Sequence, residues 1–464
     1  MHDTMTLSAA LHRDDVRLPH PHPLGSESDM TAPPTPPADP EHLTGPDATH
    51  RGYGAQAKHV VALLTGGDPL ADAVIAELDL HGGSARQTLS LGLRKGLASL
   101  NVRPPEAVAA LLKQAENTPD RADPRVLHLG DLVSLSVPPL WFALCSVTSA
   151  LTYSYTSPAV ARALADAGQP KITPTQLLAK TAVWARKCMR PGGLLHGAPG
   201  YVATIELRLR QARMRATALA DWDTGAPGLP IGHLDIARTW LGFTLTSFRA
   251  LAAVGIELNG DEERRLYQYW AYVAQLLGID ERLHGDVIDH ASAGRLRDLL
   301  CTVTAAPDEN SRTLTAATVD AQSRAMAAVP GAILPEEQLR DLILHGLWGA
   351  FGKETAARLG ISRVTATPLM PLIRVLNQQA RHWQTFSPES AQAARRNTLK
   401  ESERWPTMAV LPLSAKQHAA GGRSSAPAAW PSLNFPNVLH RMFAATEHVA
   451  GRPPQPNAPL GVLP

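Results

Sequence analysis

The stretch at residues 201–217, YVATIELRLRQARMRAT, decides the fold class, because its apolar residues recur in alternating steps of three and four. This spacing is that of an amphipathic helix with one face on a core. We therefore expect a helix here that packs against the centre of the protein. The apolar stripe consists of Val202, Ile205, Leu209, Ala212, Ala216 and Leu219.

A second face of the same helix is polar and carries Thr204, Arg208, Gln211 and Arg215. Two arginines that bracket one amide beside an apolar stripe could form a binding site. The same arginines could instead be partners of buried carboxylates such as Glu206 or Asp235. They could also form a solvated basic face, since arginines are dense in this segment, and composition alone favours that reading.

Helical spacing recurs along most of the chain, without convincing period-two alternation or a repeat of 20–50 residues. The sequence therefore predicts an all-α protein with one large domain. The expected helices begin near Pro69 and cover 85–100, 105–117, 139–155, 158–167, 176–189, 234–254, 261–277, 293–304, 335–359 and 374–384. We expect Thr173 or Thr175 and Asn259 to cap two of them.

Three segments divide the chain. Residues 1–52 are rich in Pro, His, Asp and Thr and predict a disordered arm. Residues 53–400 hold the helical domain, and periodicity is lost over 385–430. Residues 401–464 are expected to form a loosely ordered tail, with one short helix at 434–449.

Charge and cysteine content exclude several classes of protein. Lys+Arg total 44 against 42 Asp+Glu, and this balance argues against a nucleic-acid partner. The three cysteines are far apart and predict neither a disulfide framework nor a zinc site. The N-terminus shows no signal peptide and no twin-arginine signal, which predicts a cytoplasmic protein. The uncharged stretch 132–161 is interrupted by two prolines, so we expect a core helix and no integral membrane segment.

Several blocks in order resemble the rubber-oxygenase (latex clearing protein) and MpaB-type oxygenase family. They are GDPLADAV at 67–74, SALTYSYTSPAVARAL at 149–164, the central helix, GLPIGHLDIARTWLGFT at 228–244 and ALAAVGIELNGDEERRLYQYWAYVAQLLGI at 250–279. The resemblance implies a globin-like helical core that binds haem b. It also implies that dioxygen adds to an apolar, isoprenoid-like substrate at a double bond.

The family's haem-site residues carry over in part. Its motif is an arginine, a histidine three residues on and an arginine four beyond, and the histidine holds the iron. Here the motif reads Arg208, Gln211 and Arg215, so an amide stands at the axial position. The family's lysine and threonine over the haem match Lys180 and Thr181, while Leu177 replaces a frequent arginine. By resemblance, Lys180 and Thr181 are catalytic, and we expect Arg208 and Arg215 to point inward towards them.

Gln211 offers the iron only an amide oxygen, which is a weaker donor than imidazole. His233 and His196 are the alternative metal ligands, although a lone histidine is more often exposed or hydrogen-bonded. The segment LHGDVIDH at 283–290 has no standard zinc spacing, which favours a solvated turn.

Two functions follow from the resemblance. The leading hypothesis is a haem b-dependent oxygenase or related oxidoreductase that acts on an apolar or polyisoprenoid-like substrate with dioxygen. The alternative is a family member that has lost iron ligation and serves as a non-catalytic protein that binds a hydrophobic molecule or a partner. Gln211 and Leu177 decide between them.

Overall fold

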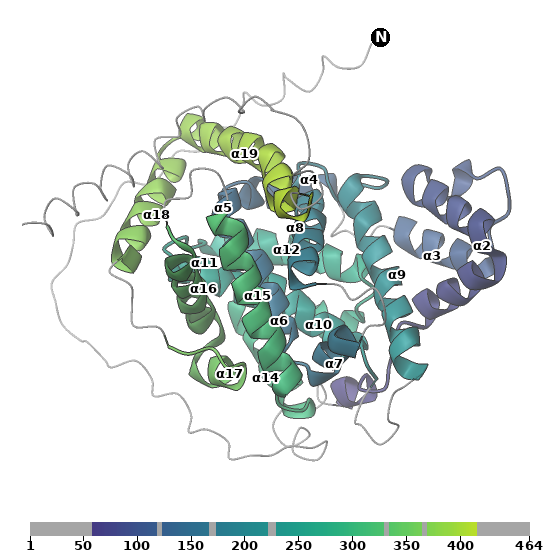
Figure 1. Cartoon of the computed structure of the whole chain (residues 1–464). Coiled ribbons are helices and arrows are strands. Elements are labelled where there is room, and N and C mark those ends of the chain that lie inside the picture. Colours follow the sequence, from purple (N-terminus) through teal and green to yellow (C-terminus); the bar gives the residue numbers. More distant parts are fainter. Residues whose placement is uncertain are drawn as a thin grey trace, which may run out of the picture. The chain divides into compact units, whose positions relative to one another are not determined.

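The predicted central helix is α9, Pro199–Ala220, which lies between α2 and α8 in the computed structural model of the chain (Figure 1). The structure describes residues 58–117, 123–166, 173–220, 229–328, 334–363 and 369–414. All of these residues belong to one compact unit. Within these ranges the regular elements are helices and no strand occurs, which confirms the all-α prediction.

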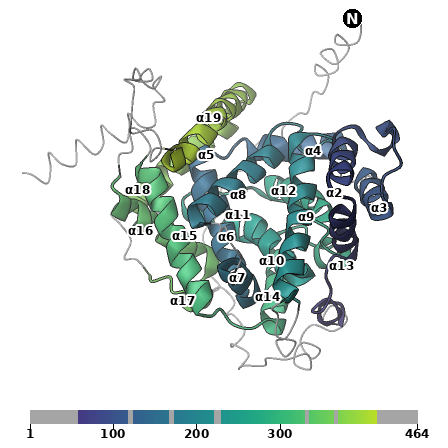
Figure 2. The same ribbon diagram turned by 45° about the vertical axis from the view of Figure 1, so that its right-hand side comes forward.

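The first long helix, α2, spans Pro69–Lys95 and begins where its proline predicts. The Asp68 side chain caps it by accepting a hydrogen bond from the Ala71 N–H at 3.1 Å. Gly82, with φ of 65°, kinks the helix. The predicted helix over 85–100 is therefore the second half of α2, followed by a 3-10 turn, η1 (Leu97–Ser99). Helix α3 (Glu106–Glu116) packs beside α2 (Figure 2), and α4 covers Pro124–Ser134.

The uncharged stretch forms the core, as predicted. It consists of α5 (Pro139–Trp141), the π-helix η3 (Phe142–Thr148) and α6 (Ser149–Ser154), and its residues are buried almost throughout. A second interrupted helix crosses it, formed by α10 (His233–Leu241), the π-helix η4 (Gly242–Thr246) and α11 (Ser247–Ala253). Gly242 permits the close crossing, because a Cβ there would lie 2.9 Å from the Ala150 Cα atom.

Further helices confirm their predicted caps. Helix α7 covers Pro158–Asp166, and α8, Pro174–Met189, begins with a capping box between Thr173 and Gln176. Helix α12, Gly260–Leu276, begins with the expected pair of Asn259 and Glu262. Two helices follow, α13 (Glu281–His284) and α14 (His290–Val303).

Four of the described helices were not predicted: α4, α13, α15 and α19. Helix α15, Glu309–Ala327, buries hydroxyl residues such as Ser311 and Thr315, and the Thr315 hydroxyl donates to the Ser311 carbonyl at 2.8 Å. Its inward face is polar, so no apolar period reveals it. Helix α19, Pro388–Ser414, is rich in good helix formers, so the expected loss of structure is wrong over these residues.

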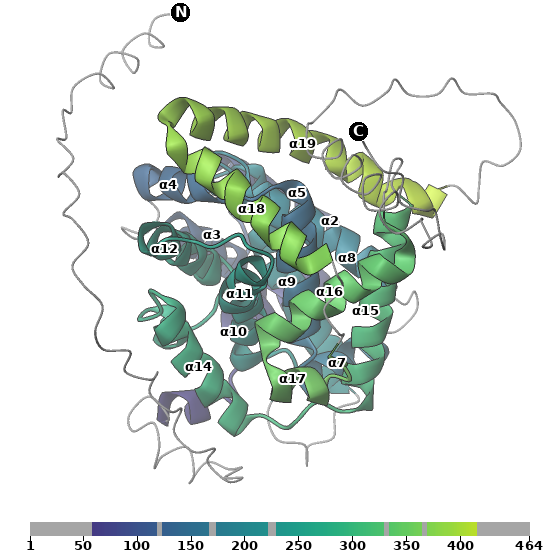
Figure 3. The ribbon, with the colours of Figure 1, turned by 90° about the vertical axis from the view of Figure 1, so that its left-hand side faces the viewer.

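The remaining helices match their predictions more closely. Helix α16 (Glu336–Phe351) and α17 (Lys353–Arg358) are separated at Gly352, whose φ is 79°. Helix α18 (Leu369–Phe386) lies alongside α19 (Figure 3). The predicted arm at 1–52 and the short helix at 434–449 fall outside the described residues. Among those described, no individual helix has the length and apolar character of a membrane span, although α4 and the α5–α6 segment would pass as a pair bent by 96°.

Candidate functional site

Arg208 of α9 is buried in an ion pair with the residue that caps α2. Its Nη2 donates to Asp68 Oδ1 at 2.9 Å, Nε donates to Asp68 Oδ2, and Nη1 donates to Gln114 Oε1 at 2.9 Å. Gly278 covers the pair with φ of 73°, and a Cβ on this residue would lie 2.5 Å from Asp68 Oδ2. The cap of α2, the middle of α9 and the turn after α12 are thus held together at one point.

Electrostatic interactions stabilise the ion pair between Arg208 and Asp68. Burial raises the pKa of Asp68, but the hydrogen bonds and charge of Arg208, with the Ala71 N–H, outweigh burial and leave the pKa below its usual value. The carboxylate therefore stays ionised at neutral pH. A bidentate arginine–carboxylate contact of this kind is among the stronger polar interactions in proteins.

Arg215, two turns further along α9, makes a similar contact. Its Nη2 donates to Asp72 Oδ1 at 2.6 Å, and its Nη1 donates to the Ile231 carbonyl at 2.5 Å. Ile231 has φ of 56°, a left-handed conformation that β-branched residues rarely adopt. Arg215 therefore fixes both α2 and the strained turn before α10. The sequence contained no signal for this strained turn.

Both arginines point inward, as expected, and each pairs with a carboxylate, although not with the carboxylates that the sequence suggested. Their carboxylate partners are Asp68 and Asp72 of α2, so the solvated-face reading is wrong. Of the two carboxylates suggested by the sequence, Glu206 is exposed, and Asp235 accepts from the Ser157 hydroxyl at 2.6 Å. The segment GDPLAD at 67–72 offered a partial signal, because its two aspartates are four residues apart at the start of one helix.

Gln211 lies between the two arginines in sequence. Unlike the guanidinium groups of both arginines, its Oε1 is buried and has no hydrogen-bond partner among the described residues. On the neighbouring α8, Lys180 is exposed, Thr181 is half-buried, and Leu177 packs against the apolar core. The structure therefore pairs α8 with α9 but directs neither arginine's hydrogen bonds to Lys180 or Thr181.

An aromatic cluster lies one turn further along α8, around Trp184. The Trp184 ring lies 5.1 Å from Phe243 of η4 and 6.2 Å from Trp270 of α12, measured between centroids. The Trp184 Nε1 donates to the Thr204 hydroxyl of α9 at 3.1 Å. Aromatic and apolar surroundings of this kind exclude water, and π-helices such as η4 are frequent at functional sites.

The two alternative histidines have different surroundings. His196 is partly exposed, its Nε2 lies 4.0 Å from Glu116 Oε1, and its ring packs on Tyr201, so local contacts account for it. His233 begins α10, and its Nδ1 is buried without a hydrogen-bond partner in the described part of the chain. Burial lowers the pKa of His233, which favours the neutral imidazole.

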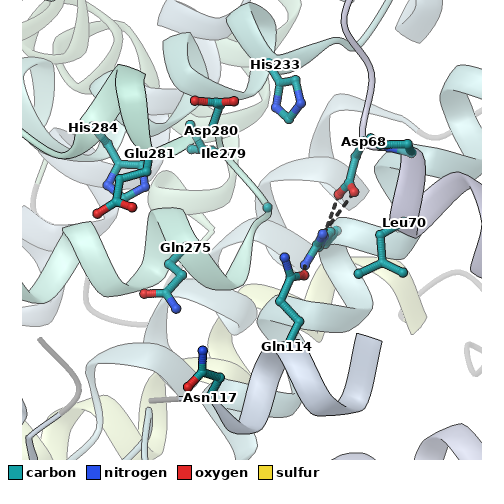
Figure 4. Close-up of a pocket in the computed structure, with 13 residues that line it drawn as sticks. Asp68, Leu70, Gln114, Asn117, His233, Gln275, Ile279, Asp280, Glu281 and His284 are labelled. Carbon is teal, nitrogen blue, oxygen red and sulfur yellow. Dashed lines mark hydrogen bonds and ion pairs between the residues drawn. The ribbon is translucent and has the colours of Figure 1, made fainter. Parts of the chain in front are cut away.

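His233 and Arg208 line the same cavity of about 520 Å³ (Figure 4). Its wall comes from the cap of α2, the end of α3, the middle of α9, the start of α10 and the turn between α12 and α13. Neither Gln211 nor the pair at 180–181 contributes to that wall. The structure thus separates the predicted site residues into two places, the cavity and the contact between α8 and α9.

The residues present fit a haem through Gln211 alone. Its orphaned oxygen is a buried acceptor at the position of the histidine in the family's motif, and an iron ion could satisfy it weakly. Arg208 and Arg215 are already saturated by aspartates, so they are poor partners for haem propionates. The described residues contain no cluster of three or more His, Cys, Asp or Glu side chains that could hold a metal ion.

Comparison with known proteins gives a consistent assignment. The structure of latex clearing protein in the closed state is similar in fold, with a TM-score of 0.51 and 18% identity over 78% of this chain and 93% of that chain. No curated protein matches the sequence. The family model described as "ER-bound oxygenase mpaB/B'/Rubber oxygenase, catalytic domain" matches residues 138–382, which is more than half of the chain. The chain therefore belongs to the family of MpaB-type and rubber oxygenases.

Proposed function

We propose that this protein is a haem b-dependent oxygenase that acts on an apolar, isoprenoid-like substrate with dioxygen. The observation that carries the proposal is the buried, unpartnered amide oxygen of Gln211 at the family's axial position. A buried acceptor without a partner costs roughly 1–3 kcal/mol, so a ligand that satisfies it is favoured. A bound haem would supply the activation of dioxygen.

The protein's own residues supply the surroundings for that chemistry. Gln211 would hold the iron side of the group, and the Trp184 cluster would keep the neighbourhood dry. Thr181, half-buried on α8, would donate its hydroxyl proton in a hydrogen bond to a polar atom at the reacting centre. The ion pairs of Arg208 and Arg215 would keep α9 fixed against α2 while a substrate enters.

Oxygen consumption tests this proposal. The full chain is reconstituted with haem b and given a short cis-polyisoprene, with squalane as a saturated substrate of similar polarity. We expect oxygen uptake and carbonyl-ended products only with the unsaturated chain. A haem-loaded protein that consumes no oxygen with either hydrocarbon would refute the oxygenase function.

A second function is favoured by the commitment of both arginines to aspartates. If haem is not retained, the same fold would bind a hydrophobic small molecule without chemistry. The discriminating observation is binding of the polyisoprene by the protein free of haem, measured by quenching of the buried tryptophans near α8. Binding without any oxygen uptake after haem is supplied would favour this alternative.

A further inference from the structure

Helix α18 turns an apolar face towards the solvent. The helix lies at the surface of the domain, on the side turned to the viewer in Figure 3. Residues 375, 379, 383 and 386 follow one another in steps of four, four and three, so their side chains share one side of the helix. Three of them are apolar and exposed, Val375 by 51%, Trp383 by 60% and Phe386 by 68%. We call these three residues the outer face of α18.

The opposite side of α18 is held on the domain by polar contacts. The buried Asn377 donates from Nδ2 to the Val254 carbonyl at 2.7 Å, and Arg381 donates from Nη2 to Glu262 Oε2 at 2.6 Å. These two contacts fix the rotation of the helix about its own axis. The outer face therefore cannot turn inward, although a surface helix usually directs its large apolar residues to the core.

The outer face forms one patch. The rings of Trp383 and Phe386 lie 5.4 Å apart, measured between centroids. Single exposed apolar side chains are common on protein surfaces, whereas grouped ones mark an interaction site. Helix α19 packs alongside α18 and still leaves this patch exposed. An additional apolar surface is therefore needed to cover it.

A segment of the same chain has a matching apolar face. The sequence NFPNVLHRMFAATEHV at 434–449, which lies outside the described residues, is expected to form a short helix. Its apolar residues recur at the spacing by which amphipathic helices dock into apolar surfaces. They include Val438, Leu439, Met442 and Val449.

The length of the chain allows this segment to reach α18. Helix α19 begins two residues after Phe386 and ends at Ser414, so its 27 residues carry the chain at most about 40 Å away. Residues 415–433 can span about 60 Å when extended. The segment at 434–449 can therefore return to the outer face of α18.

We propose that the segment at 434–449 packs as an amphipathic helix on the outer face of α18 in the same chain. Attachment to α19 keeps the segment at an effective concentration on the order of millimolar, which favours it over a second copy of the chain or a separate protein. The contact would remove both aromatic rings and the apolar side of the segment from water, which is the main driving force for such docking.

Hydroxyl-radical footprinting of the full chain, read by mass spectrometry, tests the proposal. The variant carries Leu439→Glu and Met442→Glu, which place two charges on the apolar side of the segment. We expect several-fold more labelling of Trp383 and Phe386 in this variant than in the unchanged protein. Leu80, an exposed residue of α2, is the internal reference and should be labelled equally in both. Equal labelling of Trp383 and Phe386 in the two proteins would overturn the proposal.

His440→Glu with Ala444→Glu is the matched control, because it adds the same charge at neutral pH to the opposite side of the expected helix. We expect it to leave Trp383 and Phe386 as protected as in the unchanged protein. Equal loss of protection in the control would show that charge alone is responsible, which would overturn the proposal.

The same labelling distinguishes other occupants of the outer face. Protection that disappears on dilution would assign this face to a second copy of the chain, and protection that requires phosphatidylcholine vesicles would assign it to a membrane surface. Either result would overturn the proposal. None of these outcomes depends on haem or oxygen uptake, so this proposal and the proposed function fail separately.

Discussion

Two of the arginine–aspartate pairs that join helices α2 and α9 differ in how deeply they are buried. We expect this difference in burial to determine how much each pair contributes to stability. At the start of α2, Arg208 and Asp68 have side chains that are 6% and 5% exposed. Near its middle, Arg213 and Asp79 are 43% and 49% exposed. Both pairs are bidentate, so geometry alone does not separate them. The difference in burial implies that, of these two pairs, only the Arg208–Asp68 pair helps to fix the position of α9.

The largest expected effect comes from breaking the buried pair. Arg208→Met leaves the Asp68 carboxylate buried without its cation, which should reduce the free energy of unfolding by about 3–5 kcal/mol. Denaturant unfolding followed by circular dichroism measures this loss. Arg213→Met is the matched control at the exposed pair and should leave the midpoint unchanged within error. Equal losses in the two variants would show that burial does not distinguish the pairs.

A smaller effect is expected at the glycine that covers the buried pair. Gly278→Ala places a Cβ against Arg208 and Asp68 at a positive φ, so it should cost more than the ~1–2 kcal/mol of the backbone conformation alone. Gly360→Ala has the same φ of 73°, but its Cβ would meet only the Arg312 side chain, no closer than 3.5 Å. The difference between the two unfolding free energies isolates the contact with the ion pair. No difference would show that the pair can move aside.

A buried carboxylate that has no arginine partner among the described residues extends the same comparison. Asp131 is 3% exposed and accepts from the Gly192 N–H at 2.8 Å. Burial raises its pKa to about 6, from 3.8. The folded protein therefore holds this proton between about pH 4 and pH 6 while the unfolded chain has lost it, so stability falls as pH rises through this window, by about 3 kcal/mol at most.

Asp131→Asn keeps an acceptor for Gly192 and removes the titrating group. Unfolding measured at pH 4, 5, 6 and 7 should lose this part of its pH dependence, and the variant should gain stability relative to the unchanged protein above pH 6. A pH profile identical to that of the unchanged protein would contradict the shifted pKa.

The sequence predicted the elements that are marked by apolar periodicity or by a capping residue. The helices around Asn259 and Thr173 and the uncharged core segment are of this kind. It did not predict α15, because hydroxyl side chains that bond to their own backbone fill its inward face. Nor did it predict that Asp68 and Asp72 would bind the arginines, since these partners are about 140 residues apart in the chain and only the fold brings them together. The roles of Lys180, Thr181 and Gln211 remain predictions from resemblance.

An absorption spectrum of the purified protein, with and without the change Gln211→His, tests the central claim most directly. We expect the unchanged protein to hold less than one haem per chain, or to show a spectrum unlike that of histidine-ligated iron. Gln211→His should raise haem retention, because it places an imidazole where the buried amide oxygen has no partner, at a packing cost of no more than about 1.5 kcal/mol. Full occupancy by histidine-ligated haem in the unchanged protein would contradict the account and would identify His233 or His196 as the ligand.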